Sequence, residues 1–203
     1  MTLAPAREPP PYPPADLDTR TPHFIELPEN VVLHRFYTAR FDPIFFDRSQ
    51  DGRLNAPDGA YGVLYAARTE AGAFAETFLR HPGRTLIPTD FLALKAYARL
   101  RVLRPLTLIK FSGPGLGRLG ATAEVVHGGK PYDAPQAWSK ALKAHPAGAD
   151  GIAYTARHDD EELCYALFKG RSDPVAAIDR VTELDQDWFW RIAEPYGVGI
   201  APS

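Results

Sequence analysis

The sequence has little of several features that mark particular classes of protein. It has one cysteine among 203 residues, Cys164, which excludes an internal disulfide and a cysteine-based zinc site. Its formal net charge is −2 and its isoelectric point is near 6.3, whereas nucleic-acid-binding proteins usually carry a strongly basic face. We therefore expect no direct contact with nucleic acid.

Long apolar segments are also missing. No run approaches the roughly 20 apolar residues that a transmembrane helix needs. The N-terminus reads MTLAPAREPPPYPP and lacks the apolar core of a signal peptide. The six histidines show neither HxH nor HExxH spacing, so we expect no metal site. These absences predict a cytoplasmic protein with no membrane partner.

The composition is that of a globular protein, with 45% hydrophobic and 24% charged residues, and the length favours one domain. Seven of the 20 prolines fall within residues 5–22. Each proline removes a backbone donor and favours extended conformations. The pattern predicts a proline-rich arm over residues 1–22 that lies outside the fold, followed by a single domain over residues 23–203.

Strand and helix patterns are mixed along this domain. A helix is predicted over residues 69–80, with Thr69 as its N-cap and Pro82 and Gly83 at its end. Because strands and helices do not alternate strictly, we expect an α+β fold with a mixed, mainly antiparallel sheet and surrounding helices. The other predicted helices span 135–145 and 187–196, and the predicted strands span 31–37, 61–67, 94–102, 105–111, 151–156, 163–168 and 175–184. Strand 94–102 alternates, which predicts a half-exposed antiparallel strand whose apolar side is formed by Leu94, Ala96, Ala98, Leu100 and Val102 and whose exposed side is formed by Lys95, Tyr97, Arg99 and Arg101.

A glycine pattern resembles a dinucleotide-binding motif. Gly115, Gly117 and Gly120 spell GxGxxG after the predicted strand 105–111. That motif requires a helix long enough to present its N-terminus to a pyrophosphate, and here HGGKP interrupts the chain at residues 127–131. We therefore expect no Rossmann-type site.

Two charged residues stand beside apolar neighbours. Glu76 lies at the margin of the apolar face of helix 69–80, where a carboxylate is costly unless it is paired or functional. A structural alternative is a salt bridge from Glu76 to Arg80, one turn further along. Arg35 lies within a predicted strand, and its alternative is a side chain that simply faces solvent.

The order of several short motifs is similar to that of the RES domain family. The motifs are Arg35, then GRLNAPDG (52–59), then LY (64–65), then the helical AFAE (73–76), and finally DGIAY (150–154). The family is named for an Arg, a Glu and a Ser. Its members resemble the toxins of RES–Xre toxin–antitoxin pairs. The resemblance implies a fold related to ADP-ribosyltransferases and an activity that destroys NAD.

The resemblance covers roughly residues 30–200 and implies specific roles. Arg35 and Arg53 correspond to arginines that hold the phosphates or ribose of NAD, and Glu76 to the catalytic glutamate. Tyr65 corresponds to the tyrosine beside the nicotinamide. Asn55 matches the loop at the pocket entrance, together with Pro57 and Gly59.

The third residue of the family name is missing. The segment that resembles the family's late strand has Ala156 where a serine is expected, and the hydroxyl of Thr155 points to the opposite face of a strand. Arg157 and His158 match common family choices after this position, which implies substrate contacts. Their alternative is a solvated hairpin turn over residues 157–162.

The resemblance implies that NAD is a substrate, not a cofactor, and that an Xre-type antitoxin is the partner. Cleavage of the nicotinamide–ribose bond passes through an oxocarbenium-like transition state, which Glu76 can stabilise by its charge. Nicotinamide leaves as a neutral base, so no general acid is needed. The acceptor is left open between water, phosphate and a protein side chain. The alternatives are a mono-ADP-ribosyltransferase that modifies a protein, and a catalytically lapsed module that binds NAD or a partner.

Overall fold

One eight-stranded sheet forms the centre of the molecule. The computed structural model describes residues 10–80, 83 and 85–201. The strands lie in the order β1-β6-β7-β8-β3-β2-β5-β9, and every neighbouring pair is antiparallel except β6 and β7. The mixed, mainly antiparallel sheet of an α+β fold is therefore confirmed. The strands are β1 (Phe24–Leu27), β2 (Val32–Thr38), β3 (Val63–Ala67), β5 (Lys95–Val102), β6 (Leu106–Lys110), β7 (Gly151–Ala156), β8 (Asp159–Phe168) and β9 (Val175–Val181).

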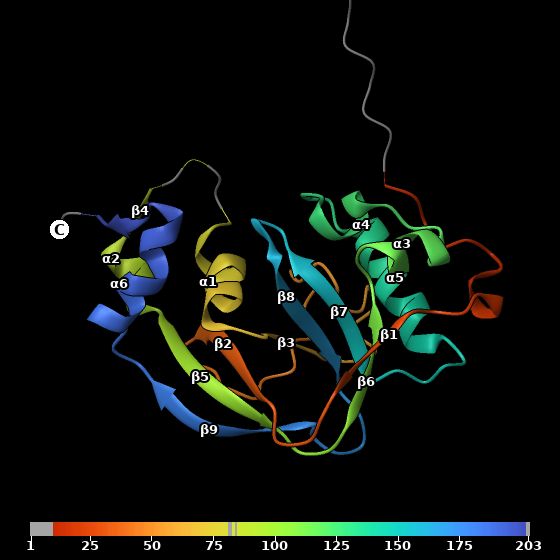
Figure 1. The fold of residues 1–203 in the computed structure, drawn as a ribbon, viewed down its shortest axis with the longest axis horizontal. Coiled ribbons are helices and arrows are strands. Elements are labelled where there is room, and N and C mark those ends of the chain that lie inside the picture. The colour runs from red at the N-terminus through yellow and green to blue at the C-terminus, as the bar shows by residue number, and fades with distance from the viewer. Residues whose placement is uncertain (1–9, 81–82, 84, 202–203) are drawn as a thin grey trace, which may run out of the picture.

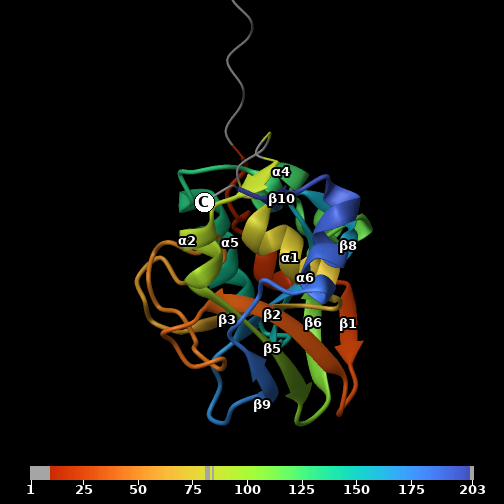
Figure 2. The same ribbon diagram turned by 90° about the vertical axis from the view of Figure 1, so that its left-hand side faces the viewer.

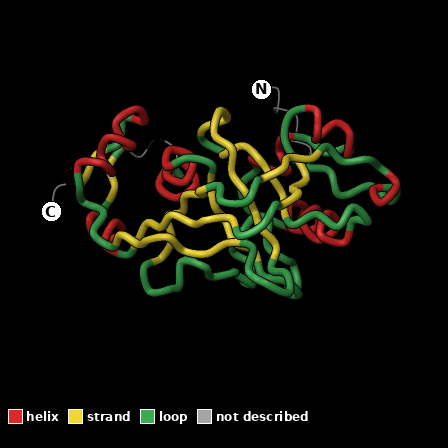
Figure 3. Tube along the Cα trace, turned by 60° about the horizontal axis from the view of Figure 1, so that its bottom comes forward, coloured by secondary structure: helices red, strands yellow, loops and turns green. Residues whose placement is uncertain are grey.

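The helices gather on one side of this sheet (Figures 1 and 2). Helices α2 and α6 lie at one end, α3, α4 and α5 lie at the other, and α1 lies between them; Figure 3 shows the same separation. A short parallel pair, β4 (Leu86–Ile87) with β10 (Gly199–Ile200), lies beside α2 and α6. The helices are α1 (Glu70–Phe78), α2 (Thr89–Ala93), α3 (Pro114–Leu119), α4 (Ala123–His127), α5 (Asp133–Ala144) and α6 (Asp187–Ala193), with 3₁₀ turns η1 (Leu17–Thr19) and η2 (Glu194–Tyr196). None of the helices within the described ranges combines the length and apolarity needed to cross a membrane.

Two apolar clusters hold the layers together, one on each face of the sheet. On the helix side, Phe74 of α1, Trp138 of α5 and Phe189 of α6 are all fully buried in one cluster. The alternation along β5 follows the prediction, with Ala96, Ala98, Leu100 and Val102 buried in the second cluster. Leu94, predicted on the same side, precedes β5 and is exposed. Tyr97 was expected on the exposed side of this strand, but it packs against Phe36 and Trp188. Long-range packing therefore covers part of the face that the sequence pattern predicts as exposed.

The N-cap residue and the apolar face of helix α1 fix its start and its position on the sheet. The Thr69 hydroxyl caps the helix by accepting a hydrogen bond from the main-chain N–H of Gly72 at 3.0 Å, as predicted. Buried Phe74 and Ala75 fix the helix on the sheet, which leaves Glu76 beside β7. The helix ends at Phe78, earlier than the predicted Arg80, and Pro82 lies outside the described residues.

Three other predicted elements differ from the structure by more than two residues at one end or by their division, whereas the remaining predicted boundaries lie within two residues. The turn between β7 and β8 is only Arg157 and His158, because residues 159–162 already pair or extend as strand β8. Strand β9 ends at Val181 rather than at Leu184. The last predicted helix divides into α6 and a separate 3₁₀ turn.

Strands β2 and β3 separate soon after they meet. Their register contains a single pair, His34 with Ala67, although β2 continues to Thr38. On its other edge β2 stays paired with β5 along its whole length. From Arg35 onward, the edge of β2 that faces β3 therefore has no strand partner, and this split in the sheet forms part of the wall of a cavity.

The N-terminal segment packs on the domain, so the prediction that it lies outside the fold is wrong for residues 10–22. Leu17 is buried in the helix-side cluster. The main-chain carbonyl of Pro11 accepts a hydrogen bond from the indole of Trp138 at 2.7 Å. Buried His145 contacts the carbonyls of Leu17 and Arg20 through Nε2 at 3.2 and 3.1 Å. Proline content signals an extended backbone but carries no information about what that backbone packs against.

Replacing Leu17 by alanine tests this packing. We expect the free energy of unfolding to fall by about 2–3 kcal/mol, because a buried leucine is truncated next to a rigid cluster. Chemical denaturation monitored by tryptophan fluorescence measures the change. The control is Asp18→Ala, an exposed neighbour in the same turn. Equal stability of Leu17→Ala and the wild type would show that the segment is only loosely attached.

Candidate functional site

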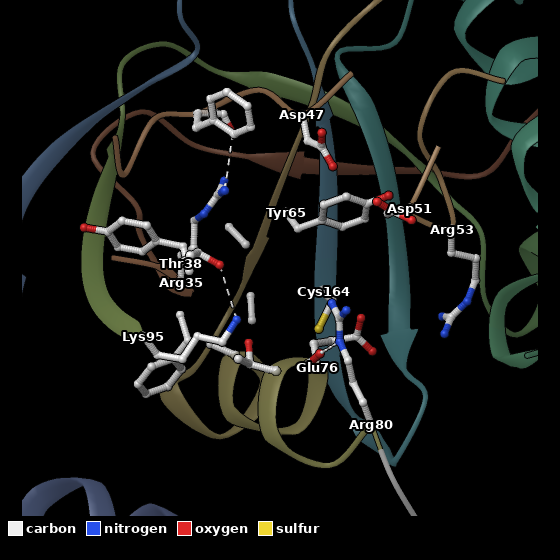
Figure 4. Close-up of a pocket in the computed structure, with 18 of the residues that line it drawn as sticks. Arg35, Thr38, Asp47, Asp51, Arg53, Tyr65, Glu76, Arg80, Lys95 and Cys164 are labelled. Carbon is white, nitrogen blue, oxygen red and sulfur yellow. Dashed lines mark hydrogen bonds between the residues drawn. The ribbon is translucent and has the colours of Figure 1, made fainter. Parts of the chain in front are cut away.

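A cavity of about 950 Å³ opens where β2 and β3 separate. Its wall comes from α1, β2, β3, the loop that follows β2, and the turn between β7 and β8 (Figure 4). Six of the seven site residues predicted from the sequence line it, namely Arg35, Arg53, Tyr65, Glu76, Arg157 and His158. Elements separated by more than 100 residues in the chain thus bring their side chains to one place.

The carboxylate of Glu76 is held by two donors. The Tyr154 hydroxyl donates to Oε2 at 3.2 Å, and the main-chain N–H of Arg157 donates to Oε1 at 3.0 Å. Arg80 contacts Glu76 differently from the predicted salt bridge. Its Nε donates to the main-chain carbonyl of Glu76 at 2.8 Å, not to the carboxylate. Two fixed donors orient a negative charge into the cavity.

The same carboxylate affects its neighbour Tyr154. This tyrosine is buried in β7, and burial, followed by the charge of Glu76, raises its pKa well above the ordinary value. Tyr154 therefore remains a neutral hydroxyl that donates to Glu76. The sequence analysis did not single it out, although Tyr154 lies within the DGIAY motif and could have been proposed from it.

Arg157 and His158 are half-buried at the cavity wall, so the alternative of a fully solvated turn does not describe them. Burial, then the neighbouring Arg157, lowers the pKa of His158 from its ordinary value. His158 is consequently neutral near pH 7, and its Nε2 is buried without a protein partner.

The guanidinium groups of Arg35 and Arg53 each donate one hydrogen bond to a main-chain carbonyl. Arg35 donates from Nη2 to the main-chain carbonyl of Phe45 at 3.3 Å, and burial lowers its pKa to about 10, so it remains charged at neutral pH. Arg53 donates from Nη1 to the main-chain carbonyl of Val126 and lies over the ring of Tyr132 at 5.8 Å. Tyr132 and the carbonyl of Val126 are contacts that the sequence analysis missed, because they come from a segment more than 70 residues away.

Arg35, Arg53 and His158 each have one buried side-chain nitrogen without a hydrogen-bond partner. Across the described residues, the buried side-chain polar atoms that lack a hydrogen bond are Nη1 of Arg35, Oη of Tyr37, Nε of Arg53 and Nε2 of His158. All four residues line this cavity. Buried polar groups are almost always paired in folded proteins. Their concentration here gives the cavity wall a group of polar atoms whose hydrogen-bonding capacity is unused.

Asn55 is placed differently from its predicted role in substrate binding. Its side chain is fully buried behind the cavity wall, and its Nδ2 donates to Asp47 at 2.9 Å and to the carbonyl of Ser49 at 2.8 Å. Its Oδ1 accepts from the Tyr65 hydroxyl at 2.9 Å. Both amide hydrogens and the amide oxygen are thus bonded within the protein, so Asn55 positions the loop and Tyr65.

Tyr65 presents its ring to the cavity while its hydroxyl faces away. The hydroxyl donates to Asn55 and accepts from the main-chain N–H of Leu54 at 2.8 Å. Burial raises the pKa of Tyr65 above its ordinary value. A hydroxyl with two fixed partners and a raised pKa is unsuited to proton transfer, so Tyr65 can act by packing its ring against a ligand.

The variant Tyr65→Phe separates these two roles. We expect kcat for the NAD cleavage that the resemblance to the RES domain family implies to stay within about fivefold of the wild type. The free energy of unfolding should fall by about 1–2 kcal/mol because two hydrogen bonds lose their partner. Tyr65→Ala is the companion variant that also removes the ring, and it should raise KM. A loss of more than 100-fold in kcat in Tyr65→Phe would instead assign the hydroxyl to catalysis.

Helix α5 supports the loop that carries Arg53. Nε2 of Gln136 donates to the carbonyls of Gln50 and Gly52 at 2.9 and 3.0 Å, and the Ser139 hydroxyl donates to the carbonyl of Leu54 at 2.6 Å. Both side chains are buried. They fix the backbone on either side of Arg53, and nothing in their local sequence points to that function.

Ala156 occupies the place where a serine was expected. It is fully buried in the same cluster as Tyr154, so the two lie on the helix face of β7. The Thr155 hydroxyl bonds Nε2 of His127 at 3.1 Å and does not take the place of the missing one. No group of three or more His, Cys, Asp or Glu side chains that could hold a metal occurs among the described residues.

Comparison with known proteins decides the family. The family model of the RES domain matches residues 30–191, which is most of the chain. The chain belongs to the RES domain family. The matched range begins just before β2, ends within α6 and contains all seven predicted site residues. Strand β1 precedes this range, yet it pairs with β6 within the same sheet.

The fold of this RES domain is also found in a solved structure. It is similar to a chain of the structure titled "Crystal structure of the M.tuberculosis MbcT-MbcA toxin-antitoxin complex", with a TM-score of 0.62 and 14% sequence identity. The match covers 77% of this chain and 85% of the other. No curated protein matches the sequence. At this identity the likeness establishes a shared fold.

Proposed function

We propose that this RES domain binds NAD in the cavity and cleaves the bond between nicotinamide and ribose. The observation that carries the proposal is the arrangement around Glu76. Its carboxylate is fixed by Tyr154 and the N–H of Arg157 in a cavity where basic side chains keep unpaired nitrogens. A negative charge beside several unused donors suits a substrate that has both phosphates and a positive reacting centre.

The pyrophosphate and the nicotinamide of NAD have suitable partners in the cavity. The two pyrophosphate charges match Arg35 and Arg53, whose guanidinium groups can form paired contacts with phosphate oxygens. The Tyr65 ring offers an apolar face to the nicotinamide. The carboxamide of nicotinamide can bond main-chain groups on the edge of β2 that β3 leaves unpaired.

The reaction needs charge stabilisation more than proton transfer. The bond between C1′ of the ribose and the ring nitrogen breaks, and its electron pair stays on nicotinamide, which leaves neutral. Positive charge develops on the ribose, and Glu76 stabilises it while accepting a hydrogen bond from a ribose hydroxyl. An acceptor oxygen then bonds C1′, and an acceptor that carries a proton on this oxygen, such as water, releases that proton to solvent. The chain's residues thus bind, orient and stabilise the oxocarbenium-like centre.

The biological role we propose is that of a toxin held inactive by an Xre-type antitoxin. Membership of the RES family and a fold shared with a chain of a toxin–antitoxin complex support this proposal. An antitoxin that covered the mouth of the cavity would exclude NAD. Expression of the chain alone should therefore stop growth and deplete cellular NAD, and the variant Glu76→Gln should do neither.

The deciding experiment measures nicotinamide released from NAD by the purified protein, with and without inorganic phosphate. Release that depends on phosphate identifies a phosphorylase, and release without phosphate identifies a glycohydrolase. Transfer of ADP-ribose from labelled NAD to a protein identifies the mono-ADP-ribosyltransferase alternative. Absence of all three products from folded protein would overturn the proposal.

The buried Ala156 supports one alternative, a domain that binds NAD but has lost its activity. Ala156→Ser would restore a hydroxyl on the face of β7 that carries Tyr154. If the wild type binds NAD without turnover and Ala156→Ser releases nicotinamide, the lapsed module is the correct description. If the wild type is active, the serine is dispensable in this chain.

A further inference from the structure

The cavity carries more positive charge than NAD can neutralise. Besides Arg35, Arg53 and Arg157, its lining includes four further cations, whereas the carboxylates among the described lining residues are those of Asp47, Asp51 and Glu76. The lining thus has a surplus of four positive charges, in a chain whose formal net charge is −2. The four further cations are Arg40, Arg48, Arg80 and Lys95.

This surplus is not neutralised within the protein. Among the described residues, none of the seven cavity cations has a carboxylate within 4.0 Å, whereas pairs such as Arg99–Asp179 and Arg104–Asp150 form elsewhere. The cavity carboxylate Asp51 instead pairs with Lys130 at 3.7 Å. Unpaired cations gathered in one concave site focus a positive potential that attracts a polyanion.

Arg40, Arg48 and Arg80 are exposed, so the member of the four further cations that burial affects is Lys95. It is half-buried at the start of β5, and its Nζ lies 3.4 Å from the Thr38 hydroxyl and 4.9 Å from the ring centre of Phe91. Burial and then the charge of Arg80 lower its pKa. Figure 4 shows Lys95 and Arg80 entering the cavity from β5 and from the end of α1. A half-buried lysine with a second cation nearby and no counter-charge is unfavourable unless an anion binds beside it.

The charges of the substrate can be compared with these cations. NAD has two singly charged phosphates and one positive nicotinamide, so its net charge is about −1, and two arginine forks match its pyrophosphate. A phosphate monoester adds nearly two further negative charges near pH 7. The cavity volume of about 950 Å³ lies at the upper end of the range for small-molecule sites and leaves room for the additional group.

We propose that Lys95 and Thr38, with Arg80 facing them, form a phosphate subsite, and that the preferred substrate is a 2′-phosphorylated nicotinamide dinucleotide (NADP). This inference rests on the proposed function and specifies its substrate. The chemistry that the subsite recognises is a phosphate dianion. Such a group can arrive as the 2′-phosphate of the dinucleotide or as free inorganic phosphate, and the experiment must distinguish these sources.

Calorimetric binding to the Glu76→Gln protein tests the subsite without turnover. We expect NADP to bind about tenfold more tightly than NAD, which corresponds to one additional charge-assisted contact. Adding Lys95→Gln should bring the two dissociation constants to within about twofold. Lys140→Gln is the matched control, because this lysine pairs with Asp58 outside the cavity lining. Lys95→Met, which keeps the aliphatic stem, replaces Lys95→Gln if the latter fails to fold.

The outcomes separate the subsite from the proposed function. Equal affinities for NAD and NADP, or an equal loss of both in Lys95→Gln, would overturn the phosphate subsite. If inorganic phosphate accelerates NAD cleavage and Lys95→Gln abolishes that acceleration, the subsite belongs to the acceptor and the NADP assignment is overturned. If the wild type releases nicotinamide from neither dinucleotide, the proposed function fails, while the ratio of binding constants still decides the subsite.

Discussion

Replacing Glu76 by glutamine is expected to lower kcat for nicotinamide release by about 10³-fold, or roughly 4 kcal/mol in barrier height. The substitution keeps the size of the side chain. Its amide oxygen can still accept a hydrogen bond from Arg157 or Tyr154, so the local structure should persist. What is lost is the negative charge that stabilises the ribose cation. Steady-state assays of nicotinamide release measure the effect.

Stability measurements on Glu76→Gln distinguish a loss of catalysis from a loss of folding. We expect the free energy of unfolding of Glu76→Gln to change by less than about 1 kcal/mol, since the amide oxygen can accept from the N–H of Arg157 while the amide NH2 donates to the Tyr154 hydroxyl, which then acts as the acceptor. Glu161→Gln, which alters an exposed carboxylate on β8, is the activity control and should match the wild type. Retention of more than a tenth of the wild-type kcat by Glu76→Gln would show that its charge is not what drives the reaction.

The second large effect concerns stability, and it arises at Asn55. Asn55→Ala is expected to reduce the free energy of unfolding by about 3 kcal/mol, because Asp47, the Ser49 carbonyl and the Tyr65 hydroxyl each lose a hydrogen bond to the fully buried amide of Asn55. Activity should fall as well, since the loop that carries Arg53 loses its anchor. Chemical denaturation at pH 7 measures the first effect and KM for NAD the second.

The pH dependence of the stability lost in Asn55→Ala shows how much of it comes from the hydrogen bond between Asn55 and Asp47. Burial alone would raise the pKa of Asp47, but hydrogen bonds from Ser49 and Asn55 outweigh it and lower the pKa below the ordinary value of 3.8. The charged form is therefore stabilised in the fold, and this contribution is present above pH 3.8 and disappears as the pH falls through the lowered pKa. The stability difference between the wild type and Asn55→Ala should accordingly narrow below pH 3.8.

A surface substitution provides the comparison for Asn55. Asp58→Asn removes an exposed partner of Lys140 in the same loop region and should be indistinguishable from the wild type in denaturation. If Asn55→Ala were as stable as Asp58→Asn, the amide of Asn55 would not hold the loop. The assignment of Asn55 to substrate contact would then have to be considered again.

The sequence alone determined much of this protein. Periodicity located the principal helices and strands, and the alternation along β5 identified its buried side chains. The anomaly of Glu76 beside Phe74 and Phe78 drew attention to the residue whose carboxylate enters the cavity. The order of short motifs indicated the RES family, which the family model establishes. Local patterns sufficed in these cases because propensity, capping and residue identity are properties of neighbouring residues.

Tertiary structure decided the remaining features. The separation of β2 from β3 after His34 depends on which strands pair, and no local signal encodes it. The same is true of the docking of residues 10–22 against Trp138 and His145. Asn55 and Arg53 lie two residues apart in one motif. The side chain of Asn55 is fully buried behind the cavity wall, whereas Arg53 lines the cavity and has an unpaired nitrogen. Whether a polar side chain holds the fold or meets a ligand depends on partners that lie far away in the chain, and only the folded structure brings those partners together.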